Sequence, residues 1–515
     1  MALQPRAMDV PVPDRIATPP VTAAAAESTD GAGFAERVKS GIVWRSGSQM
    51  VGQLIAWTAT FLVIRLLDPA DYGLVAMTGV VLTFLDLFKG WGFASALVRE
   101  PRTDSRRIGQ TFTMLLAMNG ALAALQFAVA PLAARYFHQP MVADLLRVQA
   151  LFYLANPFNA LGHALLARRL EFKRQSRIDL VAAMASAATA CGFALAGAGI
   201  WTLIAAPAAL WYTRAIGYIV AARLWQVRPR FDFAGAGAMI RYGAAMIGVQ
   251  IFWFVQSQAD VFIGGRALDP HRLGVYTTAL FLTQILAAKF VPPLNEVAFA
   301  AYSRLQERPD MIGQAFLKSA RLIMLVALPF YLGLAATAEP LVLTFLGPKW
   351  AGTAPIVPIL ALAMPMMTLQ ILFGPAINAL GKARLAVRNG IAGALIMPAA
   401  FLIGIQWGGI GLAWAWLGGM AVLLAVTLAL SLPVVGVSAA ALARALAPGL
   451  GAALAMAAGV VLVDALVPAS GPGARLALLV PTGAALYAGL LLLFARPTVV
   501  EVARLVRRMP APQVL

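Results

Sequence analysis

Apolar runs long enough to cross a lipid bilayer follow one another along nearly the whole chain, from Ile42 to Ala495. A hydrocarbon core about 30 Å thick requires roughly 20 consecutive apolar residues for each spanning helix. The runs are continuous and do not alternate apolar with polar residues, so they predict helices and not the strands of a barrel. We therefore expect an all-α integral membrane protein with no soluble domain between the spans.

Fourteen transmembrane helices are predicted. They cover residues 42–64, 73–96, 109–134, 141–166, 178–197, 200–222, 239–263, 273–300, 320–346, 354–380, 385–406, 408–432, 445–467 and 474–495. Lys and Arg collect in every second loop, as in the stretch from Arg168 to Arg177, whereas the alternate loops hold few of them. Because cytoplasmic loops carry the excess of Lys and Arg, both termini are predicted to be cytoplasmic.

Composition agrees with this interpretation and narrows the chemistry. Hydrophobic residues make up 61% of the chain and charged residues 12%, with a mean hydropathy of +0.79. The net charge of +18 would suggest nucleic acid in a soluble protein, but here it lies in short loops between spans, so no nucleic-acid partner is expected. One cysteine, Cys191, and three histidines in or beside loops predict no disulfide, metal site or cofactor. A phosphate-binding loop is also missing from the sequence.

The chain contains the same long unit twice. Arg65 opens the sequence Arg-Leu-Leu-Asp-Pro-Ala-Asp-Tyr-Gly, and Arg266 opens a second copy that repeats Arg, Leu-Asp-Pro and the final Gly at the same spacing. Asn159 and Asn378 each begin an Asn-Ala-Leu-Gly motif that ends the fourth and the tenth span. Six spans separate corresponding helices, so the halves have the same orientation and are related by an axis along the membrane normal.

The duplication divides the chain into five parts. We expect a disordered cytoplasmic tail at 1–36, a lobe of six helices at 37–232, a second six-helix lobe at 233–435, a helix pair at 436–495 and a basic cytoplasmic tail at 496–515.

Four cations remain inside predicted spans: Arg45, Lys89, Arg214 and Lys289. Ionisable groups at membrane depth cost several kcal/mol unless they are paired or hydrated, so these side chains are expected to face a polar cavity. Lys89 and Lys289 fall at near-equivalent heights in the second and eighth helices. Two simpler interpretations stay open, namely a lysine that extends to the membrane interface and a neutral pair of Lys89 with Asp86, three residues away.

Further polar and helix-breaking positions accompany these cations. Gly90 and Gly92 follow Lys89, and Pro292 and Pro293 follow Lys289. Paired helix interruptions in two repeats are typical of a substrate site, although an ordinary packing kink is the alternative. Gln49 and Gln250 match across the repeat and are also expected in the cavity, whereas the acids Asp260 and Glu296 are interpreted as interface or loop residues.

Several of these motifs have a familiar order and spacing. They are Trp44-Arg45-Ser46-Gly47, the turn from Leu67-Asp68-Pro69 to Tyr72-Gly73, Gly92-Phe93 through Ala96-Leu97-Val98, and Ser303-Arg304-Leu305-Gln306. Over about residues 38–435 the chain resembles the polysaccharide-export branch of the multidrug/oligosaccharidyl-lipid/polysaccharide exporter superfamily and is similar to Wzx-type flippases.

That resemblance implies a fold and a function. The first, second, seventh and eighth helices would line a central cavity that opens alternately to each side of a bacterial inner membrane. The cargo would be an oligosaccharide repeat unit on an undecaprenyl pyrophosphate carrier, delivered for lipopolysaccharide or exopolysaccharide synthesis beside a polymerase and a chain-length regulator. Because a pyrophosphate in a low dielectric needs cationic partners, a basic cavity among membrane lipids suits this cargo.

Three other functions remain open. A lipid II flippase would use the same cationic cavity. A cation-coupled multidrug exporter of the same superfamily would need a carboxylate-rich cavity, for which Asp86 is the deep candidate. A polysaccharide polymerase or ligase would need polar outer loops with paired carboxylates, and the short predicted loops disfavour such an enzyme.

Overall fold

The computed structural model describes residues 31–89, 97, 104–231, 236–305, 309–467 and 471–494. The described parts of the chain are helices and their connections, without a strand. In the first half the helices are α2 (Gly31–Leu66), α3 (Pro69–Asp86), α5 (Ser105–Phe137), α6 (Met141–Ala150), α7 (Phe152–Arg168), α8 (Phe172–Leu195) and α9 (Trp201–Ala222).

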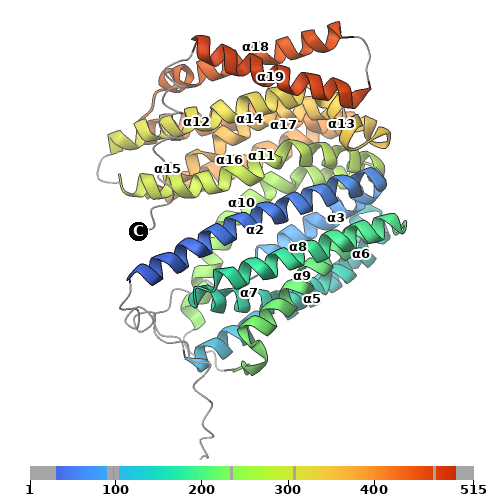
Figure 1. The fold of residues 1–515 in the computed structure, drawn as a ribbon, viewed down its shortest axis with the longest axis vertical. Helices are drawn as coiled ribbons and strands as arrows, with labels where there is room; N and C mark the ends of the chain where they lie inside the picture. The colour runs from blue at the N-terminus through green and yellow to red at the C-terminus, as the bar shows by residue number, and fades with distance from the viewer. Residues whose placement is uncertain are drawn as a thin grey trace, which may run out of the picture.

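The second half repeats this series and adds a pair. Its helices are α10 (Ala236–Ala267), α11 (Pro270–Ser303), α12 (Pro309–Ala336), α13 (Ala338–Phe345), the short 3-10 helix η2 (Pro348–Thr353), α14 (Ile356–Ile371), α15 (Phe373–Ala379), α16 (Ala383–Gly404) and α17 (Gly408–Val435). The pair is α18 (Ala439–Leu466) and α19 (Pro472–Phe494). Figure 1 shows the blue-to-green first half beside the yellow-to-orange second half, with the red pair beyond α12.

Helix lies over most of the fourteen predicted spans, with several differences in detail. In the second span the helix α3 already ends at Asp86, so Lys89, which was predicted inside the span, lies beyond the helix. Ten stretches of described residues have the length and hydropathy of a membrane span, and one of them, Ala383–Val435, contains two predicted spans. Helix α2 begins at Gly31, inside the segment that we expected to be a tail. The fourth and tenth predicted spans are each divided, at Leu151 and Leu372, into α6 with α7 and α14 with α15, and the ninth is divided at Thr337 into α12 and α13.

The two halves pack in the same order, which confirms the predicted duplication of six helices. In the first lobe α2 packs on α8, α8 and α7 both pack on α9, and α5 packs on α7. In the second lobe α10 packs on α16, α16 and α14 both pack on α17, and α12 packs on α14. The lobes meet mainly where α3 runs along α11, so the second and eighth predicted spans form the centre of the molecule.

The repeated Leu-Asp-Pro motif forms the start of these two central helices. Asp68 and Asp269 have extended backbones at the N-cap positions, and the proline that follows each is the first helical residue. The Asp269 carboxylate accepts a hydrogen bond from the backbone N–H of Arg272 at 2.9 Å. An N-cap acid accepts a hydrogen bond from a helical N–H that has no other partner. Proline at the first helical position costs no hydrogen bond, because the N–H there would be unpaired within the helix. The motif is therefore explained as a helix start.

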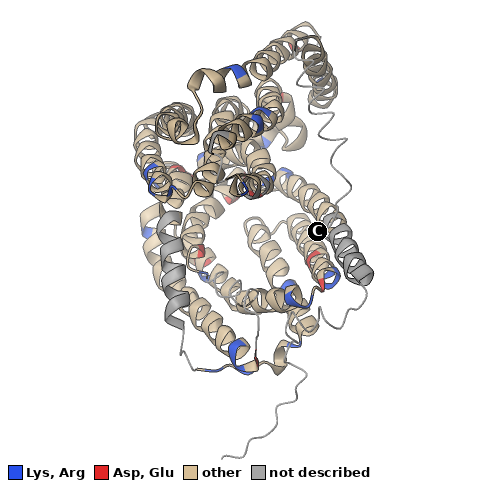
Figure 2. Cartoon of the chain, turned by 90° about the vertical axis from the view of Figure 1, so that its left-hand side faces the viewer, with Lys and Arg blue, Asp and Glu red and all other residues tan. Residues whose placement is uncertain are grey.

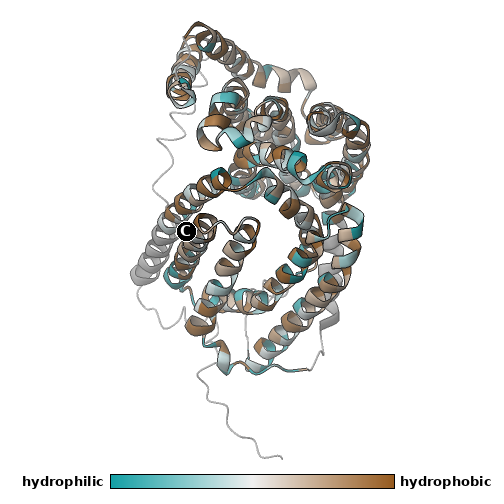
Figure 3. Cartoon of the chain, turned by 90° about the vertical axis from the view of Figure 1, so that its right-hand side faces the viewer, coloured by the Kyte–Doolittle hydropathy of each residue, from teal (hydrophilic) through white to brown (hydrophobic). Residues whose placement is uncertain are grey.

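Charge and hydropathy are distributed as a membrane protein requires. Seen along the helices from the end where α2 begins, most of the ribbon carries uncharged residues (Figure 2). Seen from the opposite end, hydrophobic stretches run along the helices, and hydrophilic ones gather toward helix ends and connections (Figure 3). Large apolar side chains such as Leu195 and Leu466 are exposed on the outside, where lipid would cover them.

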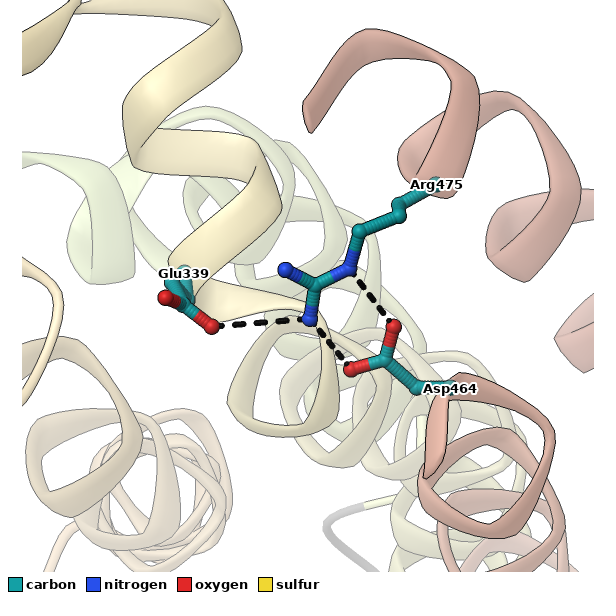
Figure 4. A network of polar contacts seen from close by, with 3 residues as sticks. All are labelled: Glu339, Asp464 and Arg475. Carbon is teal, nitrogen blue, oxygen red and sulfur yellow. Dashed lines mark hydrogen bonds and ion pairs between the residues drawn. The ribbon is translucent and has the colours of Figure 1, made fainter. Parts of the chain in front are cut away.

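An ion-pair network attaches the C-terminal helix pair to the second lobe. The Arg475 guanidinium on α19 donates from Nε to Asp464 Oδ1 at 2.9 Å and from Nη2 to Asp464 Oδ2 at 2.7 Å, and Nη2 also lies 3.5 Å from Glu339 Oε2 on α13 (Figure 4). The two-point contact with Asp464 is the stronger geometry. Arg475 therefore fixes α18, α19 and α13 at one end of the bundle.

We expect Arg475→Glu to loosen α19 from α13, because the change would bring three carboxylates together at this end. Hydrogen exchange of the α19 backbone should become faster, while the first lobe stays unchanged. Arg444→Glu is the matched control, since the exposed Arg444 hydrogen-bonds the carbonyl of Ala440 on its own helix at 3.3 Å and forms no ion pair with another described residue. Equal exchange in the two variants would contradict an attaching role for Arg475.

Candidate functional site

Lys89 lies in the turn that follows α3 and is paired. Its Nζ lies 2.5 Å from Asp86 Oδ1, and the Lys89 side chain is 14% exposed against 46% for that of Asp86. The same Nζ lies 5.3 Å from the ring centroids of Tyr153 on α7 and Trp211 on α9, which is within range of a cation–π contact. The neutral pair that the sequence left open is thus formed, and it weakens the case for anion binding through Lys89 alone.

Arg214 is paired as well. Its Nε lies 2.8 Å from Asp179 Oδ1 on α8, and both side chains are about one-third to two-fifths exposed. Arg214 is also one turn along α9 from Trp211, the aromatic residue that Lys89 contacts. Lys89 and Arg214, two of the three cations predicted in the first lobe, therefore belong to one polar region and each has its own carboxylate partner.

Lys289 has a different environment on α11. Its side chain is exposed, and no carboxylate of the described residues forms an ion pair with it. Helix α11 is continuous through Pro292 and Pro293, so the expected interruption is not a break in the helix. Because proline has no N–H, the carbonyls of Ala288 and Lys289 lose their usual helical donors. A cation without a carboxylate partner, beside carbonyls that lack their usual helical donors, is suited to bind water or a polar ligand.

The remaining sequence candidates are only partly described. Gln49 on α2 and Gln250 on α10 are both exposed. The side chain of Arg45 lies outside the described residues, and so do Gly90 and Gly92. A role for these residues in the cavity stays a prediction.

A buried polar stripe on α6 and α7 was missed by the sequence interpretation. Gln149, Tyr153, Asn156 and Asn159 are all buried and fall at helical spacing on one face. Asn159 donates to the carbonyl of Trp211 at 3.2 Å, but the side-chain oxygens of Gln149, Tyr153 and Asn159 have no hydrogen-bond partner within the described parts of the chain. A buried polar atom without a partner costs about 1–3 kcal/mol, so water or ligand hydroxyls are expected here. The spacing was a usable sequence signal.

The sequence interpretation also placed Asp260 wrongly. The expected interface role is incorrect, since Asp260 on α10 is fully buried within the second lobe. Its Oδ2 accepts hydrogen bonds from the Tyr276 hydroxyl at 2.7 Å and from Trp416 Nε1 at 3.0 Å. Tyr276 belongs to α11 and Trp416 to α17, so the carboxylate joins three helices of this lobe.

The site offers binding groups and little reactive chemistry. It combines cations, aromatic faces, amides and unpaired oxygens, which suit sugar hydroxyls and phosphate oxygens. Across the described ranges, no three His, Cys, Asp or Glu side chains gather as metal ligands would.

Known proteins similar to this chain take part in polysaccharide biosynthesis. The family model described as polysaccharide biosynthesis protein matches residues 62–355. The succinoglycan biosynthesis transport protein ExoT of Rhizobium meliloti is 27% identical over 62% of this chain and 64% of its own length. The teichuronic acid biosynthesis protein TuaB of Bacillus subtilis is 22% identical over 68% and 73%, and the lipopolysaccharide biosynthesis protein WzxC of Escherichia coli is 21% identical over 73% and 76%. The match thus spans just under two thirds of the first of these relatives.

Solved structures share the fold. The lipid II flippase MurJ in an inward closed conformation superposes with a TM-score of 0.71, at 11% identity, over 89% of this chain and all of that one. An inward-facing multidrug resistance MATE family transporter of the MOP superfamily gives a TM-score of 0.57, at 15% identity, over 78% of this chain. At such identities the likeness concerns the fold, and it confirms the all-α arrangement of two lobes.

Proposed function

Because the chain belongs to the polysaccharide biosynthesis protein family, we propose that it is a transporter that moves lipid-linked oligosaccharide units across the bacterial inner membrane. The observation that carries the proposal is the family match over most of both lobes in a chain with the fold of a flippase. The names of the relatives support this cargo, since they concern the transport or synthesis of succinoglycan, teichuronic acid and lipopolysaccharide.

Polar residues on α11, α6 and α7 support a substrate with both phosphate and sugar. Lys289 on α11 is exposed and has no carboxylate partner among the described residues, and Pro292 and Pro293 remove the usual helical donors of two nearby carbonyls. The stripe from Gln149 to Asn159, beside Trp211, supplies amides and an aromatic face in the first lobe. A polyprenyl pyrophosphate-linked glycan would place its phosphates at a cation and its hydroxyls at the amides, while its prenyl chain stays in lipid. Both termini would lie in the cytoplasm, and a polymerase and a chain-length regulator would act on the exported unit.

Deletion of the gene tests this function in cells. The expected result is loss of one surface glycan and accumulation of its lipid-linked repeat unit on the cytoplasmic leaflet, both reversed by the intact gene. Accumulation of lipid II instead would assign the chain to peptidoglycan synthesis. Repeat units that still reach the outer leaflet in the deletion strain would overturn the proposal.

A further inference from the structure

The segment that leaves the first lobe, residues 223–231, is held in a fixed position where α9 ends and α5 begins (Figure 1). We call this segment the interlobe strap. Arg223 ends α9 with a left-handed backbone, φ 54°, which turns the chain away from the helix axis. The N–H of Arg230 then donates to Thr113 Oγ1 at 2.8 Å and to the carbonyl of Gly109 at 3.4 Å. The strap therefore runs across the start of α5.

The inner side of the strap is buried against the first lobe. Leu224 is 3% exposed and belongs to a core cluster with side chains of α5, α7 and α9, and Val227 packs on the same cluster. A Cβ atom placed on Gly109 would lie 2.6 Å from the carbonyl oxygen of Arg228, so the strap approaches α5 as closely as only glycine allows. These contacts leave the strap no freedom to turn over and bury its outer side.

The outer side of the strap exposes aromatic rings together with positive charge. Trp225 is 61% exposed and Phe231 is 79% exposed, and no large apolar side chain in the described ranges is more exposed than Phe231. Arg223, Arg228 and Arg230 are exposed as well, and none of them forms an ion pair with a carboxylate of the described residues. A fixed segment thus presents two aromatic rings beside three cations.

The position of the strap indicates what covers this side. Residues Trp201–Ala222 of α9 have the length and hydropathy of a membrane span, and the strap follows directly after them. Helix α10 begins at Ala236, so the strap is short and stays at the membrane surface. Aromatic rings at the end of a span lie among lipid headgroups, and arginine guanidinium groups bind phosphate oxygens. The inner leaflet of a cell membrane is anionic, which suits the charge of the strap.

We propose that the interlobe strap binds the headgroups of anionic phospholipids, with its three arginines on phosphate oxygens and its two aromatic rings in the headgroup layer. This site goes beyond the proposed function, because its ligand is bulk membrane lipid and not the transported cargo. Each arginine near an anionic surface strengthens binding about fivefold. Because the strap leads from α9 toward α10, bound lipid would hold the connection between the lobes at the membrane surface.

Tryptophan quenching in lipid nanodiscs tests the site. Two sets of discs have the same mixture of phosphatidylcholine and phosphatidylglycerol, and bromine is placed near the headgroup of either lipid in equal amount. The difference between wild-type protein and Trp225→Phe gives the signal of Trp225. We expect brominated phosphatidylglycerol to quench this signal several-fold more than brominated phosphatidylcholine, and high salt to reduce the difference. Equal quenching by the two lipids at low salt would overturn the proposal.

Charge variants test whether the strap arginines select the lipid. The strap variant combines Arg223→Gln, Arg228→Gln and Arg230→Gln. The control removes three exposed cations at the start of α16, with Lys382→Gln, Arg384→Gln and Arg388→Gln. The strap variant should lose the preference of the Trp225 signal for brominated phosphatidylglycerol, whereas the control should keep it. A preference that survives in the strap variant would reject the three arginines as the lipid site.

A glycine variant tests the fixed position of the strap without changing its charge. Gly109→Ala places a Cβ against the carbonyl of Arg228, so it should displace the strap and lower the preference for phosphatidylglycerol. Gly120→Ala on the same helix is the control, since nothing lies within 4 Å of a Cβ on Gly120. Equal preferences in these two variants would show that the contact with α5 does not position the lipid site.

Competition separates bulk lipid from the cargo. One equivalent of polyprenyl pyrophosphate per protein should leave the quenching of Trp225 by brominated phosphatidylglycerol unchanged. Displacement of the brominated lipid would assign the strap to the cargo and overturn the proposal. Because quenching is read without transport, failure of the lipid site would leave the proposed function standing, and failure of glycan export in cells would leave the lipid site standing.

Discussion

Asp260→Ala is expected to lower the free energy of unfolding of the purified protein by about 3 kcal/mol, the range for a broken buried hydrogen-bond network. The change removes the acceptor that Tyr276 and Trp416 share, and it leaves a cavity where α10, α11 and α17 meet. The two donors keep one bond between them, from Trp416 Nε1 to the Tyr276 hydroxyl at 2.8 Å, which limits the loss. The thermal midpoint in detergent should fall by several degrees.

The control for Asp260 is another aspartate with a different environment. Asp144 on α6 is exposed and pairs with Arg147 at 3.3 Å, so Asp144→Ala should change stability by about 1 kcal/mol or less. Asp260→Asn should fall between the two, because the amide retains one acceptor oxygen. Equal midpoints for Asp260→Ala and Asp144→Ala would show that the buried network contributes nothing to the second lobe.

Lys289→Glu is expected to reduce transport about tenfold or more, since the loss of one charge-assisted phosphate contact costs at least about 1.4 kcal/mol. Lys289 is exposed on α11 without a carboxylate partner in the described parts of the chain, so its charge is available to a ligand. Lys289→Arg should retain most transport, and Lys289→Ala should be intermediate. The measurement is export of the surface glycan at matched protein levels.

Two further variants separate a local effect of Lys289 from a general effect of charge. Lys382→Glu makes the same change at an exposed position before α16, and it should leave export near normal. Lys89→Ala should lower export less than Lys289→Glu, because Lys89 is already paired with Asp86. Full export by a Lys89→Ala, Lys289→Ala double variant would refute a role for cations in moving the cargo.

The sequence predicted the features that depend on local order or on repetition. Apolar run lengths placed the fourteen helical segments, and the Asp-Pro pairs at Asp68 and Asp269 marked the starts of the central helices. The Lys89–Asp86 pair was visible from its spacing of three residues. Each of these follows from neighbours in the chain, which is why a single sequence was sufficient.

Contacts between distant helices could not be predicted in the same way. Arg214 finds Asp179 on another helix, and Asp260 finds donors on α11 and α17, so nothing near either residue in sequence indicates the partner. The break at Leu151 has no proline or glycine beside it, whereas Gly374 and Pro375 follow Leu372 closely and Pro375 lacks the N–H that the Ile371 carbonyl would accept from.

The central claim is that this protein carries a lipid-linked oligosaccharide from one leaflet to the other. Its most direct test is the purified protein in liposomes that contain a polyprenyl pyrophosphate-linked glycan, with a membrane-impermeant glycosidase added outside. We expect wild-type protein to move glycan from the inner to the outer leaflet, where the glycosidase cleaves it. We expect Lys289→Glu to move much less. The proposal would be contradicted if the glycosidase cleaved no more glycan in liposomes with wild-type protein than in liposomes without protein.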